Sequence, residues 1–306
     1  MKISRRSAMA GAAGLALAPF EKLFAVSDPY SRKGSDLKVG LAAYSFRNHF
    51  EFMKGKPNRN LLEGAPILDM PGFVDYCGEH GVEGAELTSY FFPPEVDDAY
   101  LAECRLRAHV NGVAVSGTAV GNNFSYPKDA PERAEQMEYV KQWVDHAAIM
   151  GAPHIRVFAG KHPKGVSEEE AENNAIEALA EAAEYAGAKG IFLGIENHDS
   201  IGTADRLLRI VTGVDSPWVG VNLDSGNFHS DDPYADMEAT AAYAVNVQLK
   251  TELKVGGKKE TCDFERVIGI LQDQGYAGYV VLEYEEQEDP FEHVPPILEQ
   301  LQKLTA

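Results

Sequence analysis

Short apolar runs recur along the C-terminal half of this chain of 306 residues, and each is followed by polar sequence and then by a helical stretch. Four of these runs cover residues 191–195, 218–223, 244–249 and 279–282. Positions 196, 224, 248 and 283, where these runs stop, are 28, 24 and 35 residues apart. These intervals are close to the roughly 31 residues of one unit in a (β/α)8 barrel of about 250 residues. In an open doubly wound sheet, only the strands beside the switch point converge. The pattern therefore favours an α/β fold with a single (β/α)8 TIM barrel, in which all strand ends meet at one mouth.

The rest of the chain supplies the remaining units. Alternating apolar sequence predicts further strands at 37–45, 82–88, 112–120 and 154–158. Helical spacing predicts helices at 69–80, 97–110, 130–150, 167–188, 203–211, 232–243, 263–274 and 290–303, and Ser167 with Glu170 forms a capping box. Residues 46–68 lack a clear period and are expected to form a long first loop.

Composition limits the partners of the protein. The formal net charge is −19, with 47 acidic against 28 basic residues, and 44% of the residues are hydrophobic. Nucleic acids and anionic lipids are held by clusters of Lys and Arg, so this charge disfavours both as partners. The acidic charge suits a protein that binds a small and mostly neutral molecule, and the hydrophobic content suits one large core. A homo-oligomer is possible, and the sequence does not determine the oligomeric state.

The first residues predict export. Ser4-Arg5-Arg6-Ser7 precedes an Ala-, Gly- and Leu-rich stretch over 8–20 that is too short to span a membrane. This order of features resembles a twin-arginine signal, and a basic, Ala-rich tail is the plainer alternative. We expect residues 1–36 to be signal and linker, and 37–306 to be a barrel catalytic domain that is periplasmic and free of the membrane once mature.

Four polar residues stand where the C-terminal apolar runs stop, namely Glu196, Asp224, Gln248 and Glu283. Three carboxylates crowded at one barrel mouth would repel and raise one another's pKa values unless a positive charge lay between them. Each acid taken alone has an ordinary explanation as a helix cap, a surface ion pair or a solvated strand end. The four together favour a divalent metal ion.

Several motifs carry a resemblance to a known family. The segments GIENHD at 194–199, GVNLDSGN at 220–227, VQLK at 247–250 and VVLEYE at 280–285 are similar to the sugar phosphate isomerase/epimerase superfamily of xylose isomerase-like barrels. The resemblance implies one divalent ion, often Mn2+, bound by Glu196, Asp224, Gln248 and Glu283. The family has His where this chain has Gln248, and an amide oxygen shifts the preference from Zn2+ towards Mn2+ or Mg2+, with Co2+ as a further alternative.

Such an ion would polarise a carbonyl and stabilise the enediolate that forms when a neighbouring proton leaves. We hypothesise that Glu196 and Glu283 divide the removal and return of this proton. The predicted function is a metal-dependent sugar isomerase or epimerase acting on a sugar or keto-sugar. The alternatives are a metal-dependent lyase or dehydratase on a keto-sugar, keto-glycoside or inosose, and a metal-free sugar-binding barrel. A multi-zinc apurinic endonuclease is disfavoured by the net charge of −19 and by only 9 His residues.

Six further residues are expected to contact the substrate. Arg156 is an unusual residue for a barrel strand, so an inward role facing an anion or a hydroxyl is preferred over a buried ion pair. Lys250 lies two residues beyond Gln248 and should point into the same mouth. The family has an Asp-x-x-His motif on its sixth strand. This chain has Asn227 at the His position of that motif and His229 two residues later, so the resemblance implies that a substrate-orienting His is displaced or absent. The six residues are Glu86, Arg156, His198, Asn227, His229 and Lys250.

Overall fold

The computed structural model describes residues 36–306, and the predicted export signal lies outside the described residues, as does all of the predicted linker except Asp36. The first strand begins at Leu37. Eight parallel strands form a closed barrel. They are β1 (Leu37–Ala42), β4 (Gly84–Thr88), β5 (Ala114–Ala119), β6 (His154–Val157), β7 (Phe192–Glu196), β8 (Val219–Asp224), β9 (Ala244–Leu249) and β12 (Gly278–Leu282).

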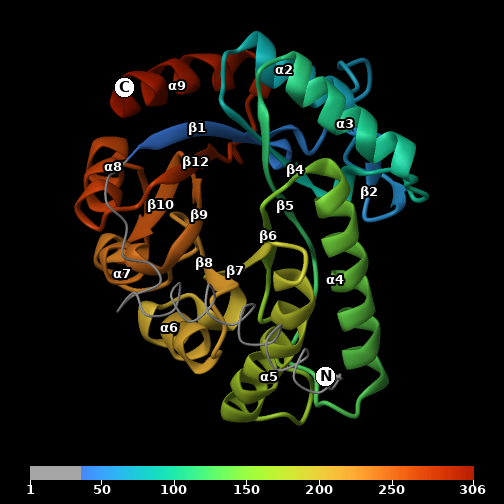
Figure 1. Cartoon of the computed structure of the whole chain (residues 1–306). Helices are drawn as coiled ribbons and strands as arrows, with labels where there is room; N and C mark the ends of the chain where they lie inside the picture. The colour runs from blue at the N-terminus through green and yellow to red at the C-terminus, as the bar shows by residue number, and fades with distance from the viewer. Residues whose placement is uncertain (1–35) are drawn as a thin grey trace, which may run out of the picture. The chain divides into compact units, whose positions relative to one another are not determined.

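The barrel closes between its first and last strands. β1 pairs in parallel with β12, with Leu37 opposite Gly278 and Leu41 opposite Leu282, and it pairs on its other side with β4. Figure 1 shows β1 in blue beside β12 in red. The remaining strands follow in chain order around the barrel, so the predicted single TIM barrel is confirmed.

Eight α-helices within 36–306 surround the strands: α2 (Met70–Glu79), α3 (Asp98–Val110), α4 (Pro131–Met150), α5 (Glu168–Gly187), α6 (Ala204–Gly213), α7 (Pro233–Thr240), α8 (Phe264–Asp273) and α9 (Pro290–Thr305). Their predicted bounds were correct to within a few residues. The capping box of α5 is present, because the Ser167 and Glu170 side chains each accept from the other's backbone N–H. Five other helices begin at an Asp whose side chain accepts a backbone N–H of the first turn: Asp69, Asp97, Asp232, Asp263 and Asp289.

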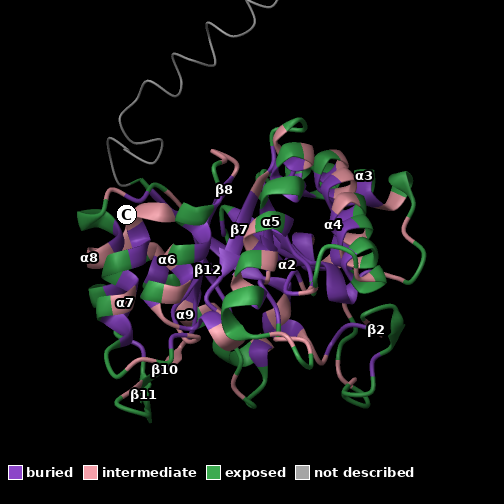
Figure 2. Cartoon of the chain, turned by 90° about the horizontal axis from the view of Figure 1, so that it is seen from below, coloured by how far each residue is buried: buried purple, intermediate pink, exposed green. Residues whose placement is uncertain are grey.

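The apolar core fills the space between strands and helices, and the exposed residues lie on the outer helix faces (Figure 2). The inside of the barrel is more polar. His154 on β6 is buried there, and two glycines make room for its ring. A Cβ atom on Gly194 would lie 2.4 Å from His154 Nε2, and one on Gly117 would lie 2.7 Å from Nδ1. Within 36–306 no helix is long and apolar enough to span a membrane.

Two small hairpins depart from the predicted pattern. β2 (Phe52–Met53) pairs with β3 (Lys56–Pro57) inside the expected long first loop. After β9, β10 (Glu252–Val255) pairs with β11 (Lys258–Thr261), where only a loop was expected. The turn between β10 and β11 is Gly256-Gly257, with φ values of 55° and 76°. A glycine pair at positive φ is a favoured two-residue hairpin turn, so the sequence did contain a signal for this hairpin.

Candidate active site

The C-terminal ends of β7, β8 and β12 bring three acids to the mouth of the barrel. Glu196 and Asp224 are the last residues of their strands, and Glu283 follows the last residue of β12. All three are buried, with exposed fractions of 3%, 1% and 6%. Parallel strands in a barrel end on the same face, which explains why residues so distant in sequence meet here.

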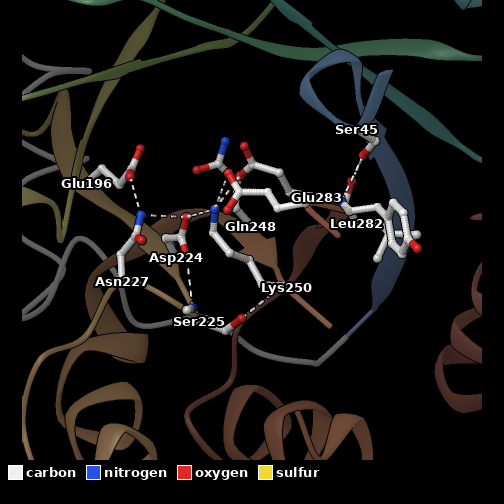
Figure 3. A network of polar contacts seen from close by, with 12 residues as sticks. Ser45, Glu196, Asp224, Ser225, Asn227, Gln248, Lys250, Leu282 and Glu283 are labelled. Carbon is white, nitrogen blue, oxygen red and sulfur yellow. Dashed lines mark hydrogen bonds and ion pairs between the residues drawn. The ribbon is translucent and has the colours of Figure 1, made fainter. Parts of the chain in front are cut away.

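Asn227 joins two of these acids. Its side-chain Nδ2 donates to Glu196 Oε1 at 2.8 Å and to Asp224 Oδ2 at 2.9 Å (Figure 3). Asp224 is also fixed through its backbone, because its N–H donates to Asn197 Oδ1 and its C=O accepts from Asn197 Nδ2, both at 2.8 Å. The Glu196 and Asp224 carboxylates therefore have defined positions before any ligand arrives.

Lys250 places a positive charge among the carboxylates. Its Nζ lies 3.3 Å from Asp224 Oδ2, 3.6 Å from Glu283 Oε2 and 3.0 Å from Glu285 Oε1. The prediction that Lys250 points into the mouth agrees with its burial and its position beside these acids in Figure 3. The carboxylates of Asp224, Glu283 and Glu285 raise the pKa of Lys250 well above its usual value despite its burial, so the ammonium stays charged.

Arg156, on β6, provides a second cation beside the carboxylates. Its Nε lies 2.8 Å from Glu196 Oε2, and its Nη1 donates to Val120 O at 2.7 Å and approaches Tyr90 Oη at 3.5 Å. Its guanidinium also lies 4.0 Å from the centre of the Phe158 ring. Arg156 does point inward, and its anionic partner is Glu196 of the protein itself.

Below the carboxylates, four side chains form a closed ring of hydrogen bonds inside the barrel. Gln248 Nε2 donates to Glu86 Oε1 at 2.8 Å, and Asn246 Nδ2 donates to Glu86 Oε2 at 3.0 Å and to Asn222 Oδ1 at 2.9 Å. Asn222 Nδ2 completes the ring by donating to Gln248 Oε1 at 2.7 Å. We call these four residues, Glu86, Asn222, Asn246 and Gln248, the amide ring. Within this ring, Gln248 Oε1 faces Asn222.

The acids at the mouth have raised pKa values. Burial, with the charges of Glu196 and Glu285, raises the pKa of Asp224 to about 7, although Lys250 opposes the change. Burial also raises the pKa of Glu283 well above its usual value, again against Lys250. Burial raises the pKa of Glu86 above its usual value. The charge of Arg156 and the hydrogen bonds from Gln248 and Asn246 offset only part of this rise. These directions mean that burial favours the neutral, protonated forms of these acids as long as no further cation lies between them.

Two histidines predicted to bind substrate have contacts other than the side chains of the three acids. His198 is half-exposed, with Nδ1 3.1 Å from Asp199 Oδ2 and its ring packed on Phe158. His229 is exposed, and its backbone N–H donates to Gly202 O at 2.7 Å. The side chain that contacts Glu196 and Asp224 at this point of the mouth is Asn227.

Sequence reasoning missed Asn197, Asn222 and Asn246. Asn222 precedes Asp224 by two residues, and Asn246 precedes Gln248 by two. Side chains two apart on a strand point to the same face, so this alternation was the signal that would have placed both in the barrel interior.

The donor set suits a divalent ion in chemistry and charge. In the described part of the chain, the buried carboxyl groups of Glu86, Glu196, Asp224 and Glu283 lie near two buried cations, Arg156 and Lys250, so a divalent ion would compensate the acids that ionise when it binds. Carboxylate and amide oxygens are the ligands that Mn2+ and Mg2+ prefer. Among residues 36–306, however, no three His, Cys, Asp or Glu side chains are already grouped as a metal site. Lys250 lies between Asp224 and Glu283, so those two acids could share an ion only if Lys250 moved.

Comparison with known proteins supports the same architecture. Residues 74–304 match the family model described as xylose isomerase-like TIM barrel. No curated protein matches the chain by sequence. A 3-keto-D-glucoside 4-epimerase from E. coli superimposes with a TM-score of 0.65 at 17% identity, covering 87% of this chain and 99% of the other.

Two further solved structures show the same fold. A D-psicose 3-epimerase from Clostridium cellulolyticum H10 gives a TM-score of 0.64 at 18% identity, covering 86% of this chain and 89% of the other. A xylose isomerase-like TIM barrel protein from Mycobacterium smegmatis, in complex with magnesium, gives 0.63 at 18% identity, covering 88% and 98%. The family model covers most of the chain, and the closed barrel agrees with it. The chain therefore belongs to the xylose isomerase-like TIM barrel family.

Proposed function

We propose that this protein is a divalent-metal-dependent sugar isomerase or epimerase that removes a proton next to the carbonyl of a sugar or keto-sugar. The observation that carries the proposal is the group of three buried carboxylates at the barrel mouth, in which Glu196 and Asp224 are joined by Asn227. Two structural neighbours, described as a keto-glucoside epimerase and a psicose epimerase, support a sugar as the substrate.

Glu196 and Glu283 have environments that suit opposite halves of a proton transfer. Glu196 accepts a hydrogen bond from Asn227 and pairs with Arg156, so its carboxylate is held at the mouth in a defined position, as a base requires. Glu283 is buried with a raised pKa, so it can hold a proton for return to the substrate. Two carboxyl groups whose environments differ in this way are typical of an acid–base pair.

The metal would be held by Glu196, Asp224, Glu283 and the amide oxygen of Gln248. When bound, it would act as a Lewis acid on the substrate carbonyl. We favour Mn2+, and the neighbour in complex with magnesium supports an ion that prefers oxygen ligands. Gln248 Oε1 already accepts from Asn222 Nδ2, so its second lone pair would have to serve the ion.

The test is proton exchange in deuterated water. Candidate ketoses and 3-keto-glycosides are incubated with protein and Mn2+, and NMR follows the loss of the proton next to the carbonyl. Exchange should occur with the wild-type protein, should fall by at least about 100-fold in Glu196→Gln and Glu283→Gln, and should persist in Glu265→Gln, whose side chain is exposed on α8. Full exchange in both site variants would refute the assigned roles, and no exchange of any candidate by the wild-type protein would count against the reaction class.

A lyase acting on a keto-glycoside is the second candidate, and one observation favours it. A cavity of about 420 Å³ lies beyond Tyr90, lined also by Gly121, Gln136 and Trp143. Tyr90 separates this cavity from Arg156, so the cavity could receive the leaving group of a longer substrate. The same NMR experiment distinguishes the two reactions, because elimination yields an unsaturated sugar and a released alcohol, whereas epimerisation leaves the glycoside intact.

We also propose that the protein is exported through its twin-arginine segment and meets free or oxidised sugars outside the cytoplasm. The order of paired Arg, apolar stretch and small residues in 5–25 supports this. Cell fractionation of the wild-type protein and of a variant with Arg5 and Arg6 both changed to Lys tests the proposal. Export of both forms to the same extent would contradict it.

A further inference from the structure

We propose that Lys250 is a resident counter-ion, which occupies the place of the divalent cation between Asp224 and Glu283 and withdraws to Glu285 when a metal ion binds. The inference rests on the proposed metal site and adds a competing group to it. It assigns to Lys250 a role in controlling metal affinity, separate from any contact with substrate.

The first argument is the position of the ammonium group. Lys250 Nζ lies between Asp224 Oδ2, at 3.3 Å, and Glu283 Oε2, at 3.6 Å, and Lys250 is only 8% exposed (Figure 3). Oxygen ligands of Mg2+ lie about 2.0–2.1 Å from the ion, and those of Ca2+ about 2.3–2.6 Å. An ion shared by these two carboxylates would therefore lie very close to Nζ, and two cations cannot share so small a buried space without strong repulsion.

The second argument is that hydrogen bonds hold the backbone at Lys250, whereas its aliphatic side chain lies against a glycine. Its backbone N–H donates to Ser225 Oγ at 2.8 Å, and Ser225 N–H donates to Gln248 O at 3.0 Å. The aliphatic part of the side chain lies against Gly226, where a Cβ atom would come within 2.6 Å of Lys250 Cδ. The backbone thus stays fixed while Gly226 leaves room for the side chain.

The third argument is that a second anionic partner lies farther out. Glu285 Oε1 is 3.0 Å from Nζ, and the Glu285 side chain is 41% exposed, against 8% for Glu283. Lys250 can therefore retain one ion pair near solvent while it leaves the two buried acids. Without this partner the displaced ammonium would lose all of its nearby carboxylates at once.

The test compares metal affinity, which does not depend on a known substrate. Titration calorimetry with Mn2+ is performed on the wild-type protein, on Lys250→Met, and on Lys254→Met, a control for an exposed lysine of β10. Methionine keeps an unbranched apolar side chain and removes the charge. We expect the dissociation constant for Mn2+ to fall by about tenfold or more in Lys250→Met and to stay unchanged in Lys254→Met.

Glu285→Gln provides the second measurement and does not depend on the folding of Lys250→Met. It should weaken Mn2+ binding in the wild-type background, because the displaced lysine loses its partner, and should have little effect when Lys250 is already Met. Equal Mn2+ affinity in the wild-type and Lys250→Met proteins would overturn the inference and leave the proposed function standing. Absence of Mn2+ binding in all variants would overturn the proposed metal site itself.

Discussion

The ion pair between Arg156 and Glu196 gives a prediction about stability. The two side chains are 6% and 4% exposed, and Arg156 Nε lies 2.8 Å from Glu196 Oε2. Removing one member of a buried pair leaves an uncompensated charge and costs about 3–5 kcal/mol. We therefore expect Arg156→Met to lower the free energy of unfolding by about that amount at pH 7, which corresponds to a fall in Tm of roughly 10 °C for a domain of this size.

The assay is urea unfolding followed by circular dichroism, with a chelator present so that only the charges of the protein are compared. Part of the loss in Arg156→Met comes from Val120 O, which also loses its donor. The double variant with Glu196→Gln isolates the ion pair, because the second substitution removes the unpaired charge. We expect the double variant to recover about 2 kcal/mol or more relative to the sum of the single losses. Single losses that add to within about 0.5 kcal/mol would refute the reasoning.

Three other perturbations test the barrel itself. Gly194→Ala should destabilise the protein by about 2 kcal/mol or more, because the new Cβ atom would lie 2.4 Å from His154 Nε2. The control is Gly269→Ala on α8, where a Cβ atom would meet nothing within 4 Å, so this substitution should be neutral or stabilising. Thermal melts compare the two variants. Burial lowers the pKa of His154 to about 3, so the unfolded chain binds a proton near pH 6.5 that the folded protein does not. The contribution of His154 to the free energy of unfolding is therefore fully present above pH 6.5 and is lost as the pH drops from 6.5 towards 3. Between pH 7 and pH 5 the wild-type protein should lose about 2 kcal/mol more than His154→Asn in urea unfolding, and equal losses would contradict this. A thiol reagent should modify no cysteine of the native protein, since burial raises the pKa of Cys77, Cys104 and Cys262, and rapid labelling would count against the packing.

The barrel could be predicted because its strands are short, largely apolar runs that recur at a regular interval. The ends of these strands also located Glu196, Asp224 and Glu283, because a closed barrel directs all of them to one mouth. The prediction required only the order and spacing of the elements. The order and spacing of the elements do not determine which side chains contact one another within the site.

The partners of each side chain could not be predicted in the same way. The side chain of Lys250 could be assigned to the mouth from its spacing after Gln248, but its choice of Asp224 and Glu283 as partners depends on distances across the barrel. Asn222 and Asn246 appear in the sequence as polar interruptions of apolar strands. Their hydrogen bonds inside the barrel explain them, because Asn246 donates to Glu86 and to Asn222, and Asn222 donates to Gln248. The hairpin β10–β11 was missed even though Gly256-Gly257 marks its turn.

The amide ring determines when the active site can form during folding. Glu86 and Gln248 are 162 residues apart in the chain, yet they are joined by a direct hydrogen bond. Contacts between such distant segments form late, because a large loop must close before they can be made. The floor of the site is therefore assembled only when the N-terminal and C-terminal halves of the chain have come together. Partly synthesised or proteolytically shortened chains should lack a competent site, even where their remaining strands and helices persist.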